Sequence, residues 1–409
     1  MTSKAGLFVL PLGNHHQRGP VAAWATTAGW ALGAEQVLGA AWVISDAGVL
    51  SPAEAAGNVS STRRGLARPR RQWHRRLLPE PAITLAKDLR QARHGRRSSL
   101  GSEGGPWTRY DVPFVWQRHT LFRRDGLALS RKLDVPLVLS VHALQVEEAA
   151  SWGVRRPGWQ RYAERWGEIP QLQAADLLAC VSPAVAELVA GRGIPESRIL
   201  VTPNGVDLDH FSPRQEGSRL REDLGLADCF VVGWSGSFRR FHGLDLAMAV
   251  MVQLEQTEPN VRLLMIGDGE ERARLERHAR ELGLTNVIFA GSVTYAEMPT
   301  YLAACDVGLV LSPESGGFHY SPVKLREYMA CGLPVVAPAV GEMRESLQNR
   351  TEAILIDPGD VNALIDAIRL LAHDPQLRED LSRRGVRLAR ERWDWRRQVK
   401  RVLEALGQS

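Results

Sequence analysis

The sequence has few cysteines and no long apolar run, and both shortages exclude classes of protein. Its 409 residues include four cysteines, with no Cys-x-x-Cys pair and no partnered histidine. This spacing predicts reduced, packed thiols and indicates neither a zinc site nor a disulfide framework. The cysteines are Cys180, Cys229, Cys305 and Cys331. No apolar stretch reaches the roughly 18 residues that a membrane span requires.

The first residues also lack a targeting pattern. Residues 7–10 form an apolar run too short for a signal-peptide core, and no cleavage pattern accompanies it. We therefore expect a cytoplasmic protein, with peripheral contact at the inner membrane face left open. A chain of 409 residues with 44% hydrophobic and 24% charged residues has an ordinary globular composition and room for two domains.

Positive charge is concentrated in one stretch. The net charge is +5, yet residues 63–97 carry twelve lysines and arginines against two acidic residues, Glu80 and Asp88. Such a stretch suits an anionic membrane surface, a phosphate-bearing acceptor or nucleic acid, and a solvated insertion is the plain alternative. No recognised nucleic-acid-binding module accompanies it, so we expect no nucleic acid partner.

Apolar runs alternate with helical patterns along most of the chain. In the first half, buried strands are predicted at residues 7–12, 40–44, 112–116, 136–141 and 176–182. In the second half, they are predicted at residues 230–234, 261–266, 287–289, 307–311, 335–337 and 353–356. Residues 46–106 have a weaker pattern and are predicted to form a mobile loop or lid. The fold class is therefore α/β, with two doubly wound, Rossmann-like domains.

Residues 321–336 combine a turn, a helix and a strand. Ser321 and Pro322 supply an N-cap hydroxyl and an N1 proline ahead of a helix, and Gly332 ends that helix. The free N–H groups of such a helix start bind anions. Glu327, one turn further on, can accept hydrogen bonds from hydroxyl groups. The pattern predicts a nucleotide held by its diphosphate and its ribose.

This segment, Ser-Pro-x-Lys-x-x-Glu-Tyr-Met-Ala-x-Gly-x-Pro-Val-Val, resembles the nucleotide-sugar loop of retaining GT-B glycosyltransferases of family 4. Residues 201–211 resemble the interdomain hinge of that family, residues 232–243 the first strand and loop of its donor domain, and residues 267–269 and 287–291 its nucleobase side. Together the matches cover residues 110–409.

The resemblance implies two Rossmann-like domains that face a cleft. Residues 1–205 would form the acceptor-side domain, with a basic insertion at residues 46–106. Residues 206–385 would bind the nucleotide sugar, and residues 386–409 would form a C-terminal helix that packs back on the first domain. The implied reaction is a metal-independent, retaining transfer of sugar from a UDP- or GDP-sugar to an acceptor hydroxyl. The donor is a co-substrate, no cofactor or metal is expected, and an anionic or lipid-linked acceptor is left open.

The resemblance also implies roles for single residues. His142, at the carboxyl end of a predicted strand, would contact the reacting sugar, and Glu327 would bind the ribose. His319, eight positions before Glu327, stands where relatives often carry a glutamate, and a structural histidine is its alternative. We assign these three to catalysis. Contacts to the nucleotide sugar are predicted for Gly19, Gly236, Ser237, Arg239, His242, Gly267, Ser292, Val293, Ser321, Pro322, Val323, Lys324 and Glu327.

The chain departs from the family pattern at two positions. Many relatives carry arginine where this chain has Ser237 and lysine where it has His242, so Arg239 is predicted to supply the missing charge. Lys324 is interpreted as a phosphate contact, with a surface lysine as the alternative. Two rival functions remain open, a nucleotide-sugar epimerase of the same fold and a non-catalytic membrane- or nucleic-acid-associated binding protein that uses the basic stretch.

Overall fold

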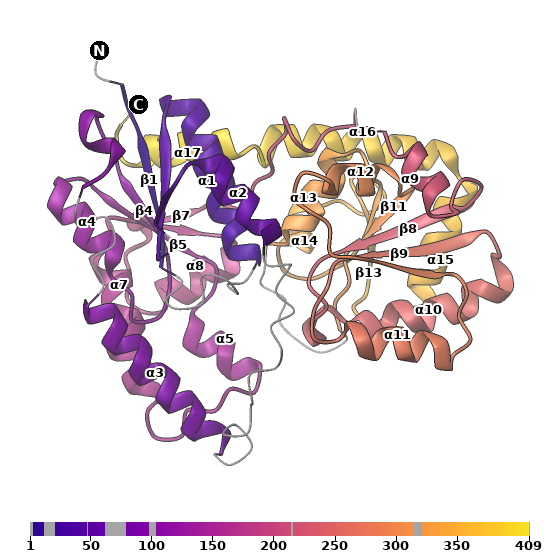
Figure 1. The fold of residues 1–409 in the computed structure, drawn as a ribbon, viewed down its shortest axis with the longest axis horizontal. Coiled ribbons are helices and arrows are strands. Elements are labelled where there is room, and N and C mark those ends of the chain that lie inside the picture. Colours follow the sequence, from indigo (N-terminus) through magenta and orange to yellow (C-terminus); the bar gives the residue numbers. More distant parts are fainter. Residues whose placement is uncertain are drawn as a thin grey trace. The chain divides into compact units, whose positions relative to one another are not determined.

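A computed structural model describes residues 3–11, 21–46, 48–61, 79–97, 104–213, 216–313 and 321–408. The chain forms two compact units (Figure 1). Unit 1 comprises Met1–Asn204 together with Trp395–Ser409, and unit 2 comprises Gly205–Asp394. The first division, between Asn204 and Gly205, falls within residues 201–211, the segment that resembles the interdomain hinge of the family.

Unit 1 contains a sheet in the order β3-β2-β1-β4-β5-β6-β7, parallel except for β3. Its strands are β1 (Gly6–Leu10), β2 (Ala41–Ser45), β3 (Gly48–Leu50), β4 (Val115–Arg118), β5 (Leu137–Val141), β6 (Leu177–Cys180) and β7 (Ile199–Val201). Its α-helices are α1 (Val21–Leu38), α2 (Pro52–Ser61), α3 (Glu80–Arg97), α4 (Asp125–Leu133), α5 (Gln145–Ser151), α6 (Gln160–Tyr162), α7 (Ile169–Ala174), α8 (Pro183–Ala190) and α17 (Trp395–Ala405). A π-helix, η4 (Ala163–Glu168), joins α6 to α7. Strands β1, β5 and β6 are buried along their whole length because helices cover both faces of a parallel sheet.

Unit 2 contains a parallel sheet in the order β10-β9-β8-β11-β12-β13. Its strands are β8 (Phe230–Ser235), β9 (Val261–Ile266), β10 (Val287–Gly291), β11 (Val307–Leu309), β12 (Val335–Pro338) and β13 (Ile354–Ile356). Its α-helices are α9 (Ser218–Asp223), α10 (Leu244–Thr257), α11 (Arg272–Glu281), α12 (Met298–Ala303), α13 (Val323–Ala330), α14 (Gly341–Ser346), α15 (Val361–His373) and α16 (Pro375–Arg392). Each face of this sheet has its own apolar core. The predicted fold class, two Rossmann-like α/β units, is confirmed.

The prediction of a mobile loop at residues 46–106 was wrong for much of that range. Strand β3 and helices α2 and α3 lie within it. Asp88 in α3 is buried and accepts hydrogen bonds from Arg156 Nε (2.8 Å) and Trp159 Nε1 (3.0 Å). A buried polar contact of this kind leaves no apolar periodicity, which is why the hydrophobic pattern missed α3. The first half of the basic stretch, residues 63–76, lies outside the described residues.

The C-terminal return to unit 1 is made by α17, whereas the sequence predicted a return from residue 386. Helix α16 stays in unit 2, because Val206 N donates to Trp393 O (2.7 Å) and Trp393 is buried in a unit 2 core. Trp395 belongs to unit 1, where it packs 5.5 Å from the Trp30 ring of α1. A Cβ on Gly29 would lie 2.2 Å from Trp395 Nε1, so α1 needs glycine there for close approach.

No helix in the part of the chain that the structure describes is long and apolar enough to cross a membrane.

Candidate functional site

The strand order of unit 2 marks a ligand site. After β8 the chain adds β9 and β10 on one side, then returns to place β11 on the other side of β8. The loops after β8 and β11 therefore leave the sheet in opposite directions. In an open α/β sheet, ligands bind in the crevice at the carboxyl ends of such a pair of strands.

Backbone contacts bring the loops after β8, β9 and β10 together. Gly236 N donates to Ile266 O (2.9 Å), and Gly267 N donates to Gly291 O (2.7 Å). Gly267 has a φ of +138°, and a Cβ there would lie 1.9 Å from Gly236 O. Only glycine permits this approach. One edge of the sheet therefore brings together three predicted contact positions, Gly236, Gly267 and Ser292. Ser292 is half-buried and follows Gly291.

Helix α13 is held at the same edge by Tyr328. Its buried hydroxyl accepts a hydrogen bond from Ser235 N (2.7 Å), the last residue of β8, and lies 3.0 Å from Ser235 Oγ. Gly308 in β11 makes room for the ring, because a Cβ there would lie 2.4 Å from Tyr328 Cδ2. The tyrosine thus places the first turn of α13 over the end of β8.

Lys324 lies in that first turn and Glu327 lies three residues further along α13. Both side chains are half-buried. Lys324 Nζ lies 4.1 Å from the centre of the Trp234 ring, and 2.9 Å from the point that a Cβ on Gly236 would occupy. Burial lowers the pKa of Lys324 to about 7 and raises the pKa of Glu327 to about 7, although each charge favours the ionised form of the other. A cation beside the glycine loop and a carboxylate one turn away form the pair that the sequence predicted for diphosphate and ribose.

The predicted cap of this helix was wrong in detail. Pro322 is the N-cap residue of α13, and no side chain caps the helix. Ser321 instead hydrogen bonds to Glu342, whose carboxylate also pairs with the buried Arg326. The Ser321 hydroxyl is therefore used to hold the turn ahead of the helix. Val323, another predicted contact to the nucleotide sugar, is the first residue of α13.

The loop after β8 carries the residues that depart from the family pattern. Ser237 is half-buried and Arg239 is exposed. His242 lies edge-on to Trp234, with ring centres 5.5 Å apart, and burial together with Lys324 and Arg239 lowers its pKa to about 2. A neutral imidazole cannot replace a lysine charge. Among the described residues at this loop, Lys324, Arg239 and Arg240 carry positive charge, and Arg240 is paired with Glu271.

In unit 1, His142 follows β5 at the carboxyl edge of the sheet. Arg118, the last residue of β4, lies with Nη1 2.8 Å from His142 Nε2 and donates to Thr26 Oγ1 of α1 (2.8 Å). A guanidinium only donates, so His142 Nε2 accepts and Nδ1 carries the proton. Burial and the neighbouring Arg118 and His119 hold the pKa of His142 well below its usual value. His142 is therefore a neutral, oriented hydrogen-bonding group.

Sequence reasoning missed Arg118 and Trp234, which orient His142 and Lys324. Arg118 carried a signal like that of His142, because both are polar residues within two positions of the end of a predicted strand, at residues 112–116 and 136–141. Trp234 carried none, because a tryptophan inside an apolar strand reads as core. Gly19 and His319 lie outside the described residues, and Val293 is half-buried next to Ser292.

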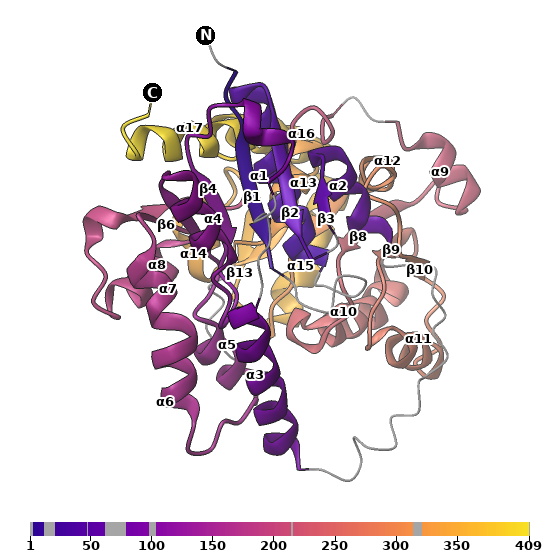
Figure 2. The same ribbon diagram turned by 60° about the vertical axis from the view of Figure 1, so that its left-hand side comes forward.

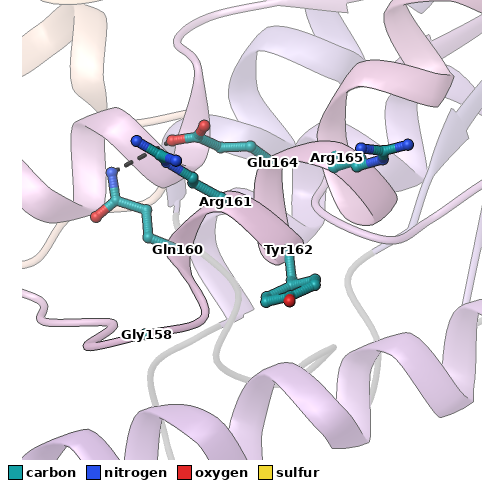
Figure 3. A pocket seen from close by; sticks show the side chains of 6 residues that line it. All are labelled: Gly158, Gln160, Arg161, Tyr162, Glu164 and Arg165. Carbon is teal, nitrogen blue, oxygen red and sulfur yellow. Dashed lines mark hydrogen bonds between the residues drawn. The ribbon is translucent and has the colours of Figure 1, made fainter.

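Within the described ranges, no three His, Cys, Asp or Glu side chains are grouped as a metal site requires. A pocket of about 640 Å³ lies on α6 and η4 of unit 1 (Figure 3). It is lined by Gly158, Gln160, Arg161, Tyr162, Glu164 and Arg165, none of which was predicted to bind the nucleotide sugar.

Comparisons with known proteins agree with the two-unit reading. Residues 219–387 match the family described as glycosyl transferases group 1, and residues 43–210 match the family described as glycosyltransferase family 4. The D-inositol 3-phosphate glycosyltransferase of Paenarthrobacter aurescens is 30% identical over 355 residues, which are 83% of this chain and 81% of that protein. A GDP-mannose-dependent alpha-(1-6)-phosphatidylinositol monomannoside mannosyltransferase of Mycolicibacterium smegmatis is 29% identical over 57% of this chain and 62% of that protein.

The crystal structure of Anabaena HepE in complex with UDP and glucose has a TM-score of 0.66 and 21% identity, with both chains fully covered. This likeness shows the GT-B fold. The relatives are named as transferases, so neither the epimerase nor the non-catalytic binding protein gains support. The chain therefore belongs to glycosyltransferase family 4 and is a nucleotide-sugar-dependent glycosyltransferase.

Proposed function

We propose that the chain transfers a hexosyl group from a UDP- or GDP-sugar to a hydroxyl of an anionic or lipid-linked acceptor, with retention of configuration and without a metal ion. The observation that carries this proposal is the Lys324–Glu327 pair of α13, in which Lys324 Nζ lies over the ring of Trp234, near the end of β8. A diphosphate needs a cation, and a ribose needs a hydrogen-bond acceptor. This pair supplies both within one helical turn.

In the proposed donor complex, Lys324 and Arg239 contact the diphosphate and Glu327 accepts hydrogen bonds from the ribose hydroxyls. The base lies against the backbone near Gly267, Ser292 and Val293. Because Lys324 and Arg239 neutralise the departing diphosphate, they lower the barrier to breaking the bond between the sugar C1 and the phosphate oxygen. No metal is then needed to stabilise the leaving group.

The proposed transfer step uses the donor itself as the base. The bond from C1 to the phosphate oxygen breaks, the acceptor oxygen forms a new bond to C1 on the same face, and the acceptor proton passes to the departing phosphate. Configuration is retained because attack and departure share one face. His142 hydrogen bonds to a hydroxyl of the donor sugar, and Arg118 is a positioning residue that fixes the ring.

The proposed acceptor is anionic. Two relatives are named for inositol 3-phosphate and for a phosphatidylinositol monomannoside, and both carry phosphate. The basic stretch at residues 63–97 of this chain suits the same chemistry, in a cytoplasmic enzyme with peripheral contact at the inner membrane face.

The proposal is tested by screening UDP- and GDP-sugars for transfer to inositol phosphate and phosphatidylinositol acceptors, with and without excess EDTA. We expect turnover with one donor, unchanged by EDTA, and a product whose anomeric configuration by NMR matches the donor. Inversion would contradict the proposed step. Activity lost in EDTA and restored by Mg²⁺ or Mn²⁺ would show a metal site that the proposal lacks.

Arg239→Ala is expected to weaken nucleoside diphosphate binding about tenfold, since a charge-assisted hydrogen bond contributes about 1.5 kcal/mol at an exposed site. Nucleoside binding should not change, because a nucleoside has no phosphate. Calorimetry with both ligands checks this. Arg240→Ala is the matched control, since Arg240 is equally exposed and its Nε lies 3.4 Å from Glu271 Oε1. Equal losses for nucleoside and nucleotide would remove Arg239 from the phosphate site.

A further inference from the structure

Large apolar side chains are exposed in two neighbouring stretches of unit 1. Seven large hydrophobic side chains are exposed in the described chain, and five of them lie in α3 or in the stretch from the end of α5 to η4. They are Leu85 (37% exposed), Leu89 (62%), Trp152 (49%), Tyr162 (64%) and Trp166 (60%). Single exposed apolar residues are normal, but such clustering indicates an interaction surface. We call these five residues the aromatic patch.

The two stretches are joined by a buried polar contact. Asp88, in the middle of α3, accepts hydrogen bonds from Arg156 and Trp159 in the turn that leads into α6. Helices α3 and α6 accordingly lie side by side (Figure 2). The exposed aromatic side chains are thus carried on a fixed part of the fold.

Exposed cations accompany the aromatic patch. Arg161 and Tyr162 lie in α6, and Arg165 and Trp166 follow in η4, so each cation stands next to an aromatic residue in one helical segment. Figure 3 shows Arg161, Tyr162 and Arg165 on this segment. The Arg165 guanidinium lies 5.7 Å from the centre of the Trp166 ring. Across residues 80–95 and 152–166, the described side chains include two carboxylates that reach solvent, the exposed Glu80 and the half-buried Glu164, which accepts a hydrogen bond from Gln160. The exposed lysines and arginines there are Lys87, Arg90, Arg93, Arg155, Arg161 and Arg165.

We propose that the aromatic patch and these cations dock unit 1 onto an anionic lipid bilayer. Tryptophan and tyrosine favour the headgroup level of a membrane, because their rings are apolar and their N–H and O–H groups stay hydrated. Lysine and arginine at that level are attracted to anionic headgroups. Charge of one sign beside apolar rings therefore fits an anionic lipid surface better than a second protein, whose interface core is depleted of charge.

This inference rests on the proposed peripheral membrane contact, but its test does not use activity. The full chain is sedimented with vesicles of phosphatidylcholine alone, and of phosphatidylcholine with roughly 30% phosphatidylglycerol. We expect binding to the anionic vesicles that weakens as salt is added. The double substitution Tyr162→Ser/Trp166→Ser should lower binding at least ~10-fold. Arg161→Glu/Arg165→Glu should lower binding to anionic vesicles by a similar factor and leave weak binding to neutral vesicles unchanged.

Matched controls come from α11 and its end in unit 2, where Arg277→Glu/Arg280→Glu and Leu282→Ser change exposed residues of the same kinds. These variants should bind anionic vesicles like the parent. Nucleotide affinity, measured separately, should be unchanged in every variant, so loss of the proposed donor site would be seen independently of vesicle binding.

A conservative second test avoids any loss of folding. Brominated lipids should quench the parent's tryptophan fluorescence, and Trp152→Phe/Trp166→Phe should remove that quenching while binding persists. The proposal is overturned if the parent ignores anionic vesicles at low salt, or if the patch variants bind them as the parent does. It is equally overturned if sedimentation velocity shows a dimer that the patch variants abolish without affecting vesicle binding.

Discussion

Lys324→Met should weaken nucleoside diphosphate binding about 100-fold, the effect of losing about 3 kcal/mol from charge-assisted contacts to phosphate in a half-buried site. Methionine keeps the length and the packing of the side chain on the Trp234 ring, so the fold should survive. Nucleoside binding should fall much less, because a nucleoside has no phosphate and is affected only through the rise in the pKa of Glu327 that loss of the lysine charge causes. Calorimetry with the diphosphate and the nucleoside gives both numbers.

Lys324→Arg is the informative control for this prediction. It keeps a positive charge but moves it along a longer, planar side chain, so most of the affinity should return. If Lys324→Met binds the diphosphate as tightly as the parent, then Lys324 is only a packing residue on Trp234 and Arg239 must carry the phosphate charge alone.

Glu327→Gln should weaken nucleotide binding about 10- to 150-fold, which corresponds to about 1.5 to 3 kcal/mol for a hydrogen bond between a carboxylate and a hydroxyl. The decisive ligand is the 2′,3′-dideoxynucleoside diphosphate, which lacks both ribose hydroxyls. The parent and the variant should bind this ligand equally, because the interaction that the substitution removes is already absent. A variant that loses as much affinity for the dideoxy ligand as for the natural nucleotide would falsify the ribose assignment.

The two substitutions should also separate two opposing pH dependences. Burial places the pKa of Lys324 and that of Glu327 near 7 from opposite directions. In Glu327→Gln, Lys324 is the member of the pair that still titrates, and loss of the carboxylate charge lowers its pKa below the parent value. Affinity should therefore fall as the pH rises through a range below 7, where the ammonium loses its proton. In Lys324→Arg, the guanidinium stays charged and Glu327 must ionise to accept the ribose hydroxyls fully, so affinity should rise through pH 7. In the parent, protonation of Glu327 below pH 7 and deprotonation of Lys324 above it should both weaken binding, so affinity should be greatest near pH 7.

Local patterns were enough to predict most strands of the two sheets. Buried parallel strands read as short apolar runs, and β5 and β9 lie within one residue of their predicted bounds. Gly332, with a φ of +81°, ends α13 as predicted, because only glycine takes that conformation without strain. The shared helix face of Lys324 and Glu327 also followed from short-range spacing, since residues three apart lie on one face of a helix, and their contacts to phosphate and ribose stay predictions.

Other features depended on residues that are far apart in the sequence, and only the tertiary structure decided them. The sequence by itself determined two Rossmann-like units, while its hinge and its phosphate site at the start of α13 stay predictions. The tertiary structure decided that Lys324 rests on Trp234, that Arg118 orients His142, and that α3 is a helix fixed through Asp88. It also assigned Trp393 and Trp395, two residues apart, to different units. The physical reason is range, because periodicity and turn chemistry act over a few residues, whereas burial and partner choice are set by packing between distant segments.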